Sequence, residues 1–215
     1  MTIRNVIFDL DGTLLDTSEG IIESIQFAVH ELGYEQLSYD ELCTFVGPPI
    51  QQSFMNHYGC DKETAQKAAD IFREYYMTTA LLKAKPYDGI YELCERLKKK
   101  GIRMAVATYK REDYAVQLLC HFHFNDYCDP MHGGDNLDQL RKEDIIKRCQ
   151  SEMNASPENC VMVGDTVGDA LGAVKANTPF IAVRYGFGFK IPEEINAYPN
   201  IGTAGNPLEI ADLIL

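Results

Sequence analysis

The sequence predicts an α/β protein: a Rossmann-like parallel sheet with helices on both faces, interrupted by an inserted α-helical cap. Short apolar runs alternate with helix-like segments along most of the chain, which is typical of a parallel sheet covered on both faces. Residues 16–83, by contrast, show helical periodicity and no convincing strand. We therefore expect a catalytic core domain made of residues 1–15 and 84–215, and a helical cap domain made of residues 16–83.

The core strands are expected where short runs are rich in apolar residues, since strands buried on both faces have this pattern. These runs are residues 3–10, 102–108, 160–164 and 180–183. Helical spacing and terminal signals place the core helices between them. They are expected at residues 90–97 after a cap at Asp88, and at 113–122, 141–153, 169–176 and 207–215.

In the insert, residues 21–32 have apolar residues at helical spacing, and Gly33 is a typical C-terminal stop. A short helix is expected over residues 40–46, and Asp61 is expected to cap a long helix covering 65–82. The Gly47-Pro48-Pro49 break between them suits a rigid segment that reaches into a site. A plain helix–helix turn is the alternative.

Charge and cysteine usage narrow the functional classes. The net charge of −12 disfavours nucleic acid and anionic membranes as partners. No apolar stretch nears the roughly 20 residues that span a bilayer, and Asp9 and Asp11 interrupt the only early apolar run, which argues against a signal peptide. Seven cysteines without a CxxC fit free thiols in a reducing cytoplasm. The oligomeric state stays open.

Polar side chains follow three of the expected strands: Asp9 and Asp11, then Thr108, then Asp165 and Asp169. Parallel sheets bind ligands beyond the carboxyl ends of their strands, so we expect these residues to converge. In an extended segment, side chains at i and i+2 share a face. One acid of the first pair can therefore serve as nucleophile and the other as acid/base.

Four converging carboxylates need a cation, because two like charges 4 Å apart repel by roughly 4 kcal/mol at an effective dielectric of about 20. A hard divalent ion such as Mg²⁺ relieves this repulsion and also bridges phosphate. The alternative for Asp165 and Asp169 is capping of the following helix. Lys142 could neutralise a phosphoryl group, with Lys110, Arg111 and Lys147 as competitors.

Four segments in order resemble the motifs of the haloacid dehalogenase superfamily, and the resemblance covers essentially the whole chain. They are Asp9-Leu10-Asp11-Gly12-Thr13, Thr108-Tyr109-Lys110, Lys142, and Gly164-Asp165 with Asp169. Within the superfamily, the chain resembles phosphoglycolate-phosphatase-type members with a small helical cap. The family's lysine is often followed by proline, whereas Glu143 follows Lys142 here.

The resemblance implies a Mg²⁺-dependent phosphatase that hydrolyses a small phosphate ester through an aspartyl-phosphate on Asp9. It implies that Asp11 is the general acid/base, and that Thr108 and Lys142 hold the phosphoryl group. The Mg²⁺ ligands implied are Asp9, Asp11 through its carbonyl, Asp165 and, in support, Asp169. Substrate contacts are predicted at Gly12, Thr13, Thr108, Tyr109, Lys142, Gly47 and Pro48.

The expected partner is a small phosphorylated metabolite: phosphoglycolate, a sugar phosphate and a nucleotide all stay open. A phosphomutase of the same fold and a pyrophosphatase are the alternative reactions. A nonenzymatic binding module has no need for the Asp9/Asp11 pair. A Rossmann cofactor binder is disfavoured because no GxGxxG follows the first strand.

Overall fold

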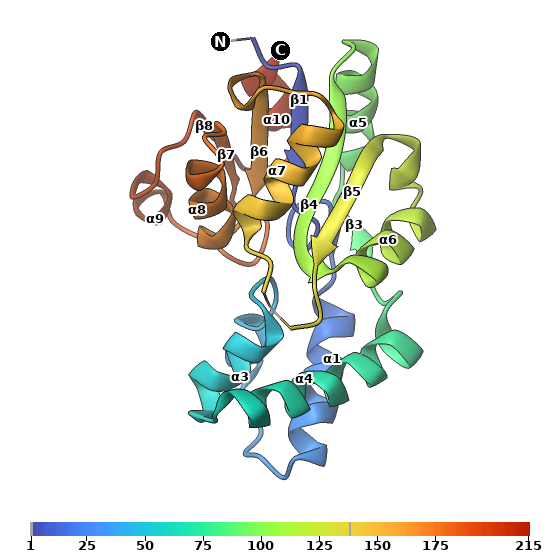
Figure 1. Cartoon of the computed structure of the whole chain (residues 1–215), viewed down its shortest axis with the longest axis vertical. Coiled ribbons are helices and arrows are strands. Elements are labelled where there is room, and N and C mark those ends of the chain that lie inside the picture. The colour runs from blue at the N-terminus through green and yellow to red at the C-terminus, as the bar shows by residue number, and fades with distance from the viewer. Residues whose placement is uncertain (1, 138) are drawn as a thin grey trace.

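A six-stranded parallel sheet forms the centre of the molecule in the computed structural model, which describes residues 2–137 and 139–215 (Figure 1). The strand order is β5-β4-β1-β6-β7-β8, and every neighbouring pair is parallel. The strands are β1 (Asn5–Phe8), β4 (Arg103–Arg111), β5 (Cys128–Gly134), β6 (Cys160–Gly164), β7 (Phe180–Val183) and β8 (Gly202–Ala204). The predicted α/β fold class is confirmed.

The first strand lies in the middle of the sheet, between β4 and β6. At its last residue, Phe8 pairs with Val106 of β4 and with Val163 of β6. The chain segments that follow these three positions therefore leave the sheet at the same edge. This register is what brings residues 9, 108 and 165 close together.

Alternate strand residues point to opposite faces, and each face is covered by its own helices. On β1, Val6 and Phe8 belong to one apolar cluster and Ile7 to the other. The first cluster includes residues of α5 (Ile90–Lys99), α6 (Glu112–His121) and α10 (Pro207–Ile214). The second includes residues of α7 (Lys142–Glu152), α8 (Val167–Lys175) and α9 (Pro192–Asn196). Short 3₁₀ turns cover Phe124–Asp126 and Pro157–Asn159.

A block of helices lies beyond the carboxyl edge of the sheet (Figure 1). It contains α1 (Ser18–Glu31), α2 (Tyr39–Cys43), α3 (Ile50–Tyr58), α4 (Lys62–Tyr75) and a π-helical turn, Tyr76–Ala80. Two short antiparallel strands, β2 (Leu15–Asp16) and β3 (Lys85–Pro86), mark where the chain leaves the sheet region and returns. The division into a core domain and a cap domain at residues 16–83 stays a prediction.

Several elements differ from the sequence-based expectation. The edge strands β5 and β8 and the helix α3 were not predicted. β5 carries Pro130 and two glycines, which weaken a strand signal. The helix expected to reach residue 82 changes to π geometry at Tyr76. Asp88 does not cap α5, because Gly89 occupies that position with φ 85°.

One helix start and one helix end also differ from the expectation. α8 begins before residue 169, with Thr166 as its N-cap residue, and α2 ends at Cys43, short of the expected residue 46. Within residues 2–137 and 139–215, no helix combines the length and apolar character needed to cross a bilayer.

Candidate active site

Three buried carboxylates converge at the carboxyl edge of the sheet. Asp9 follows β1, Asp165 follows β6, and Asp169 lies in the first turn of α8; one oxygen of each lies within 4.8 Å of the others. The Nζ atom of Lys142, the first residue of α7, is 2.7 Å from Asp9 Oδ1 and 2.6 Å from Asp169 Oδ1. One buried ammonium group therefore contacts two of the three carboxylates, Asp9 and Asp169.

The charges in this cluster do not balance. Burial and the neighbouring Asp169 carboxylate, opposed by Lys142, raise the pKa of Asp9 to about 7. Burial, with Asp169 and Asp9, raises the pKa of Asp165 to about 8. Burial alone would lower the pKa of Lys142, but the carboxylates of Asp169 and Asp9 outweigh it and raise that pKa. Without a further cation, the cluster favours protonated carboxyl groups.

The donor atoms fit a divalent cation. Asp165 Oδ1 is buried and has no hydrogen-bond partner among the described residues, while its Oδ2 accepts from the backbone N–H groups of Phe187 (2.7 Å) and Gly188 (3.1 Å). Asp169 Oδ1 is close enough to Lys142 for an ion pair but lacks hydrogen-bond geometry. All three residues offer carboxylate oxygens, the ligands that hard cations prefer.

Asp169 has a second contact that bears on its role. Its Oδ2 accepts hydrogen bonds from the backbone N–H (3.0 Å) and hydroxyl (2.7 Å) of Thr166. Asp169 therefore takes part in the capping of α8, as the alternative interpretation expected, and faces Lys142 with its other oxygen.

Two glycines allow backbone to approach Asp165 closely. Gly12 has φ 80°, a conformation that favours glycine, and a Cβ atom there would overlap Asp165 Oδ2. A Cβ atom at Gly186 would overlap both that oxygen and the carbonyl oxygen of Gly12. The resulting contact leaves no room for side chains on this side of the carboxylate.

The side chain of Asp11 lies beside the three-carboxylate cluster and has different partners. Its Oδ1 accepts from Thr17 Oγ1 at 2.5 Å and lies 3.1 Å from Lys110 Nζ. Lys110 is buried as well, so it is a second lysine of the site, although sequence comparison placed it only as a competitor of Lys142. Ligation of a metal by the Asp11 carbonyl stays a prediction.

The predicted phosphoryl and substrate contacts lie around these groups. Thr108 is buried, and its Oγ1 accepts from the backbone N–H of Lys110 at 3.1 Å, which leaves its own hydroxyl proton to donate elsewhere. Tyr109 OH accepts from the backbone N–H of Lys142 at 3.1 Å. The Thr13 hydroxyl is buried with no partner in the described part of the chain.

A cavity of about 70 Å³ lies between the sheet edge and the helical block, next to Asp11. The predicted contacts Gly47, Pro48 and Tyr109 line it. Its wall also contains residues that were not predicted to contact substrate: Tyr76, Lys110, Arg111 and Tyr114. The π-helical turn that contains Tyr76 could not be predicted from the sequence, because its apolar residues continue the helical spacing of α4.

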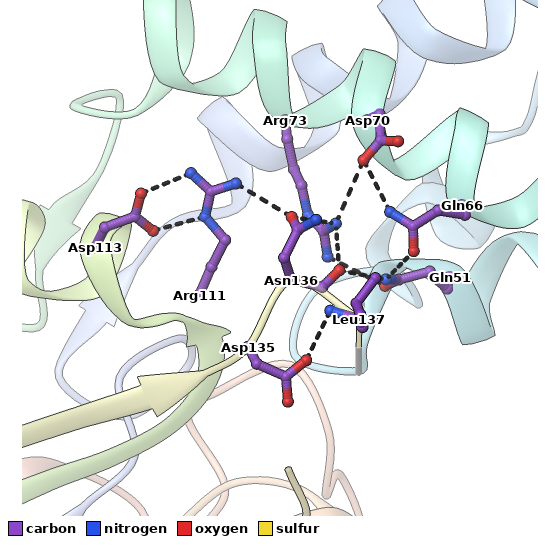
Figure 2. Close-up of polar contacts among 9 residues, drawn as sticks. All are labelled: Gln51, Gln66, Asp70, Arg73, Arg111, Asp113, Asp135, Asn136 and Leu137. Carbon is purple, nitrogen blue, oxygen red and sulfur yellow. Dashed lines mark hydrogen bonds and ion pairs between the residues drawn. The ribbon is translucent and has the colours of Figure 1, made fainter. Parts of the chain in front are cut away.

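Polar contacts join the helical block to the loop after β5 (Figure 2). Arg73 of α4 donates from NH1 to the carbonyl oxygen and to Oδ1 of Asn136, both at 2.9 Å. Gln51 of α3 donates to the same carbonyl at 3.2 Å. Arg111 donates to Asn136 Oδ1 at 3.3 Å from the opposite side. Asn136 was missed because β5, which precedes it, was not predicted.

The fold is a Rossmann-like parallel sheet with a buried cluster of three carboxylates at its carboxyl edge. A family model described as haloacid dehalogenase-like hydrolase matches residues 6–183. The chain belongs to this family, as the motifs indicated.

Relatives and solved structures place the chain among the phosphatases of the family. It is 38% identical over 196 residues to a 5'-nucleotidase of Pseudomonas aeruginosa, covering 90% of this chain and 87% of that protein. It is 32% identical to a phosphoglycolate phosphatase of Agrobacterium fabrum, covering 84% and 80%. The crystal structure of a predicted phosphatase from Clostridium acetobutylicum superimposes with a TM-score of 0.91 at 35% identity, covering both chains completely. The chain is accordingly a hydrolase with phosphatase activity.

Proposed function

We propose that this phosphatase is Mg²⁺-dependent and hydrolyses a small phosphate ester through an aspartyl-phosphate on Asp9. The observation that supports this most directly is the contact of Asp9 Oδ1 with Lys142 Nζ at 2.7 Å, beside Asp165 and Asp169 in a buried cluster. A carboxylate nucleophile divides a very slow hydrolysis into two easier displacements.

In the first displacement, a carboxylate oxygen of Asp9 attacks phosphorus as the bond to the leaving oxygen breaks. Asp11 donates a proton to that oxygen, and the alcohol departs. Lys142 and Thr108, with Gly12 and Thr13, hold the phosphoryl oxygens during the transfer.

In the second displacement, water attacks the phosphorus of the aspartyl-phosphate. Asp11 now takes a proton from that water, the bond between phosphorus and Asp9 breaks, and inorganic phosphate leaves. The proton lost by Asp11 in the first step is thereby recovered, and Asp9 returns to its carboxylate form.

The metal ligands proposed are the carboxylates of Asp9, Asp165 and Asp169 and the carbonyl of Asp11. When bound, Mg²⁺ supplies positive charge that offsets these carboxylates and the phosphoryl oxygens. The buried, unpaired Asp165 Oδ1 and the raised pKa values of Asp9 and Asp165 support this assignment.

Residues 16–83 are proposed to act as a cap that excludes water during phosphorylation of Asp9. Gly47, Pro48 and Tyr109, which line the cavity, are the proposed substrate contacts. The names of the relatives, 5'-nucleotidase and phosphoglycolate phosphatase, support a small phosphorylated metabolite as substrate. The cytoplasm is the proposed compartment, because the cysteines are free thiols. Phosphomutase and pyrophosphatase are the alternative reactions.

The Asp9→Asn variant tests the proposal. Since an amide cannot act as the nucleophile, kcat for para-nitrophenyl phosphate is expected to fall by on the order of a thousandfold or more. Mass spectrometry of the acid-quenched wild-type enzyme is expected to find phosphate on the peptide that contains Asp9. In the same assay, EDTA stops wild-type turnover and Mg²⁺ restores it.

The matched control is Asp126→Asn, which makes the same change at an exposed position and is expected to keep full activity. Wild-type turnover by a folded Asp9→Asn variant would refute the nucleophile. Turnover that persists in EDTA would refute the metal requirement.

A further inference from the structure

The hydroxyl of Tyr76 is a buried polar group that the mechanism above does not use. Tyr76 is 1% exposed; the Lys110 ammonium lies close enough to donate to its hydroxyl, but no acceptor for the hydroxyl proton is present among residues 2–137 and 139–215. It belongs to the wall of the cavity that adjoins Asp11. A buried hydroxyl proton without an acceptor costs free energy. A polar group that enters the cavity and accepts a hydrogen bond from the hydroxyl would remove this cost.

Local structure holds Tyr76 in this position. It begins the π-helical turn that follows α4, and such turns occur frequently at functional sites. On the outside, the turn packs so closely on α1 that a Cβ atom at Gly20 would overlap the carbonyl oxygen of Ala80. On the inside, the Tyr76 ring stacks on Phe72 and meets Tyr114 edge-on. The ring is thus fixed from both sides.

Lys110 connects Tyr76 to the acid that protonates the leaving group. Its Nζ atom lies 4.8 Å from the centroid of the Tyr76 ring and 3.1 Å from Asp11 Oδ1. The lysine side chain is 7% exposed. An ammonium group has three N–H donors, so one buried cation lies next to both the proposed acid and the Tyr76 hydroxyl.

The size and lining of the cavity restrict what can enter it. A single water needs roughly 10–15 Å³, so a cavity of about 70 Å³ holds only a few non-hydrogen atoms. Although the chain carries a net charge of −12, the cations in the cavity wall, Arg73, Lys110 and Arg111, outnumber its two acids, Asp11 and Asp135. This combination suits a small group that carries oxygen acceptors.

We propose that Tyr76 and Lys110 form a binding site for an oxygen acceptor, a carboxylate or a hydroxyl, on the leaving-group side of the substrate. The acceptor lies within a few bonds of the ester oxygen that Asp11 protonates. This inference rests on the proposed function and narrows its substrate class to phosphate esters of small hydroxy acids or polyols. Esters of plain alkyl alcohols leave the Tyr76 hydroxyl proton without an acceptor.

Three substrates of similar size test the proposal: 2-phosphoglycolate, which has a carboxylate; glycerol 2-phosphate, which has hydroxyls; and ethyl phosphate, which has neither. The readout is the ratio of kcat/KM for each oxygen-bearing ester to kcat/KM for ethyl phosphate. The wild-type ratio is expected to exceed one for at least one of the two esters. Tyr76→Phe is expected to lower that ratio about tenfold, the effect of one lost hydrogen bond.

The matched control is Tyr75→Phe. It removes a hydroxyl from the preceding residue, where it donates to Glu23 at 2.7 Å on the outer side of the same helix. The control is expected to keep the wild-type ratio. Because the readout is a ratio, a loss of folded enzyme in either variant does not imitate the effect.

The outcomes separate this inference from the proposed function. An unchanged ratio in Tyr76→Phe, with all three esters still hydrolysed, would overturn the binding site and leave the phosphatase mechanism intact. Failure of the wild-type enzyme to hydrolyse any phosphate ester, or to form a phosphoenzyme, would overturn the proposed function and this inference with it. A ratio that falls for only one ester identifies the acceptor as carboxylate or hydroxyl.

Discussion

Asp165 is held in place by backbone groups and not by another side chain. The N–H groups of Phe187 and Gly188 both donate to its Oδ2, which leaves Oδ1 facing the cluster. The loop that provides these donors lies directly against the carboxylate, because Gly186 has no side chain. Changing the groups that orient a metal ligand typically costs roughly 10- to 100-fold in metal affinity, so this loop bears on the metal site proposed for Asp165.

The Gly186→Ala variant is therefore expected to weaken Mg²⁺ activation. The added methyl group would displace Asp165 or the Gly12 backbone, so the Mg²⁺ concentration for half-maximal turnover should rise roughly ten- to hundredfold. A titration of turnover against Mg²⁺ measures this. Gly33→Ala is the control: its Cβ meets open space, although its φ of 66° is strained. It should lose roughly 1–2 kcal/mol of stability and keep the wild-type midpoint.

Much of the carboxylate cluster could be predicted from the sequence. Asp9 and Asp165 follow uninterrupted apolar runs, so their meeting could be predicted from strand register alone. The sequence could not decide between Lys142 and Lys110 as the lysine of the site, because both side chains are buried and each faces a different carboxylate. Nothing in the sequence indicates that the hydroxyl of Tyr76 lacks an acceptor.

The contact between α4 and the loop after β5 is the main polar connection between the helical block and the sheet. Arg73, Gln51 and Asn136 meet there with little exposure of Arg73 or Gln51 to solvent. Asp135 stabilises the loop by accepting from the backbone N–H of Leu137 at 2.6 Å. The position of α4, and with it the position of Tyr76, depends on this contact.

The Arg73→Met variant is expected to raise KM by roughly ten- to hundredfold, because buried charge-assisted hydrogen bonds contribute roughly 1.5–3 kcal/mol. Hydrogen exchange should also become faster in α4. Steady-state kinetics on para-nitrophenyl phosphate and exchange mass spectrometry measure the two effects. The same change at exposed Lys62 of α4 is the control. An unchanged KM with unchanged exchange would show that the contact does not position α4.

The elements differ in how far sequence could predict them. The strands β1, β4, β6 and β7 were found because the middle of each is buried on both faces and is therefore apolar. The edge strand β5 contains Pro130, Gly133 and Gly134, and its pairing with β4 shifts register. The spacing of apolar residues does not reveal the change from α to π geometry at Tyr76, since apolar residues face the core on both sides of this change.

For the whole molecule, the buried acids make stability depend on pH and on metal. The pKa values of Asp9 and Asp165, about 7 and 8, lie above the ordinary value of 3.8. The folded chain therefore binds more protons than the unfolded chain between about pH 4 and 8. It follows that the free energy of unfolding falls as pH rises through this window.

In EDTA, we expect the free energy of unfolding to fall by on the order of a few kcal/mol between pH 5 and pH 8. Mg²⁺ should reduce this fall, because it binds the deprotonated carboxylates. Denaturant unfolding at both pH values, with and without Mg²⁺, measures the effect. Asp165→Asn, which removes one of the two groups, should flatten the dependence in EDTA. A wild-type profile that is flat in EDTA would contradict the expectation.

The central position of β1 also matters during protein synthesis. Its two neighbours in the sheet, β4 and β6, are formed by Arg103–Arg111 and Cys160–Gly164. The apolar strand Asn5–Phe8 consequently leaves the ribosome long before either partner exists, while the helices of residues 18–80 are completed first. Until Cys160–Gly164 emerges, this unpaired, uncharged strand is open to pairing with other chains.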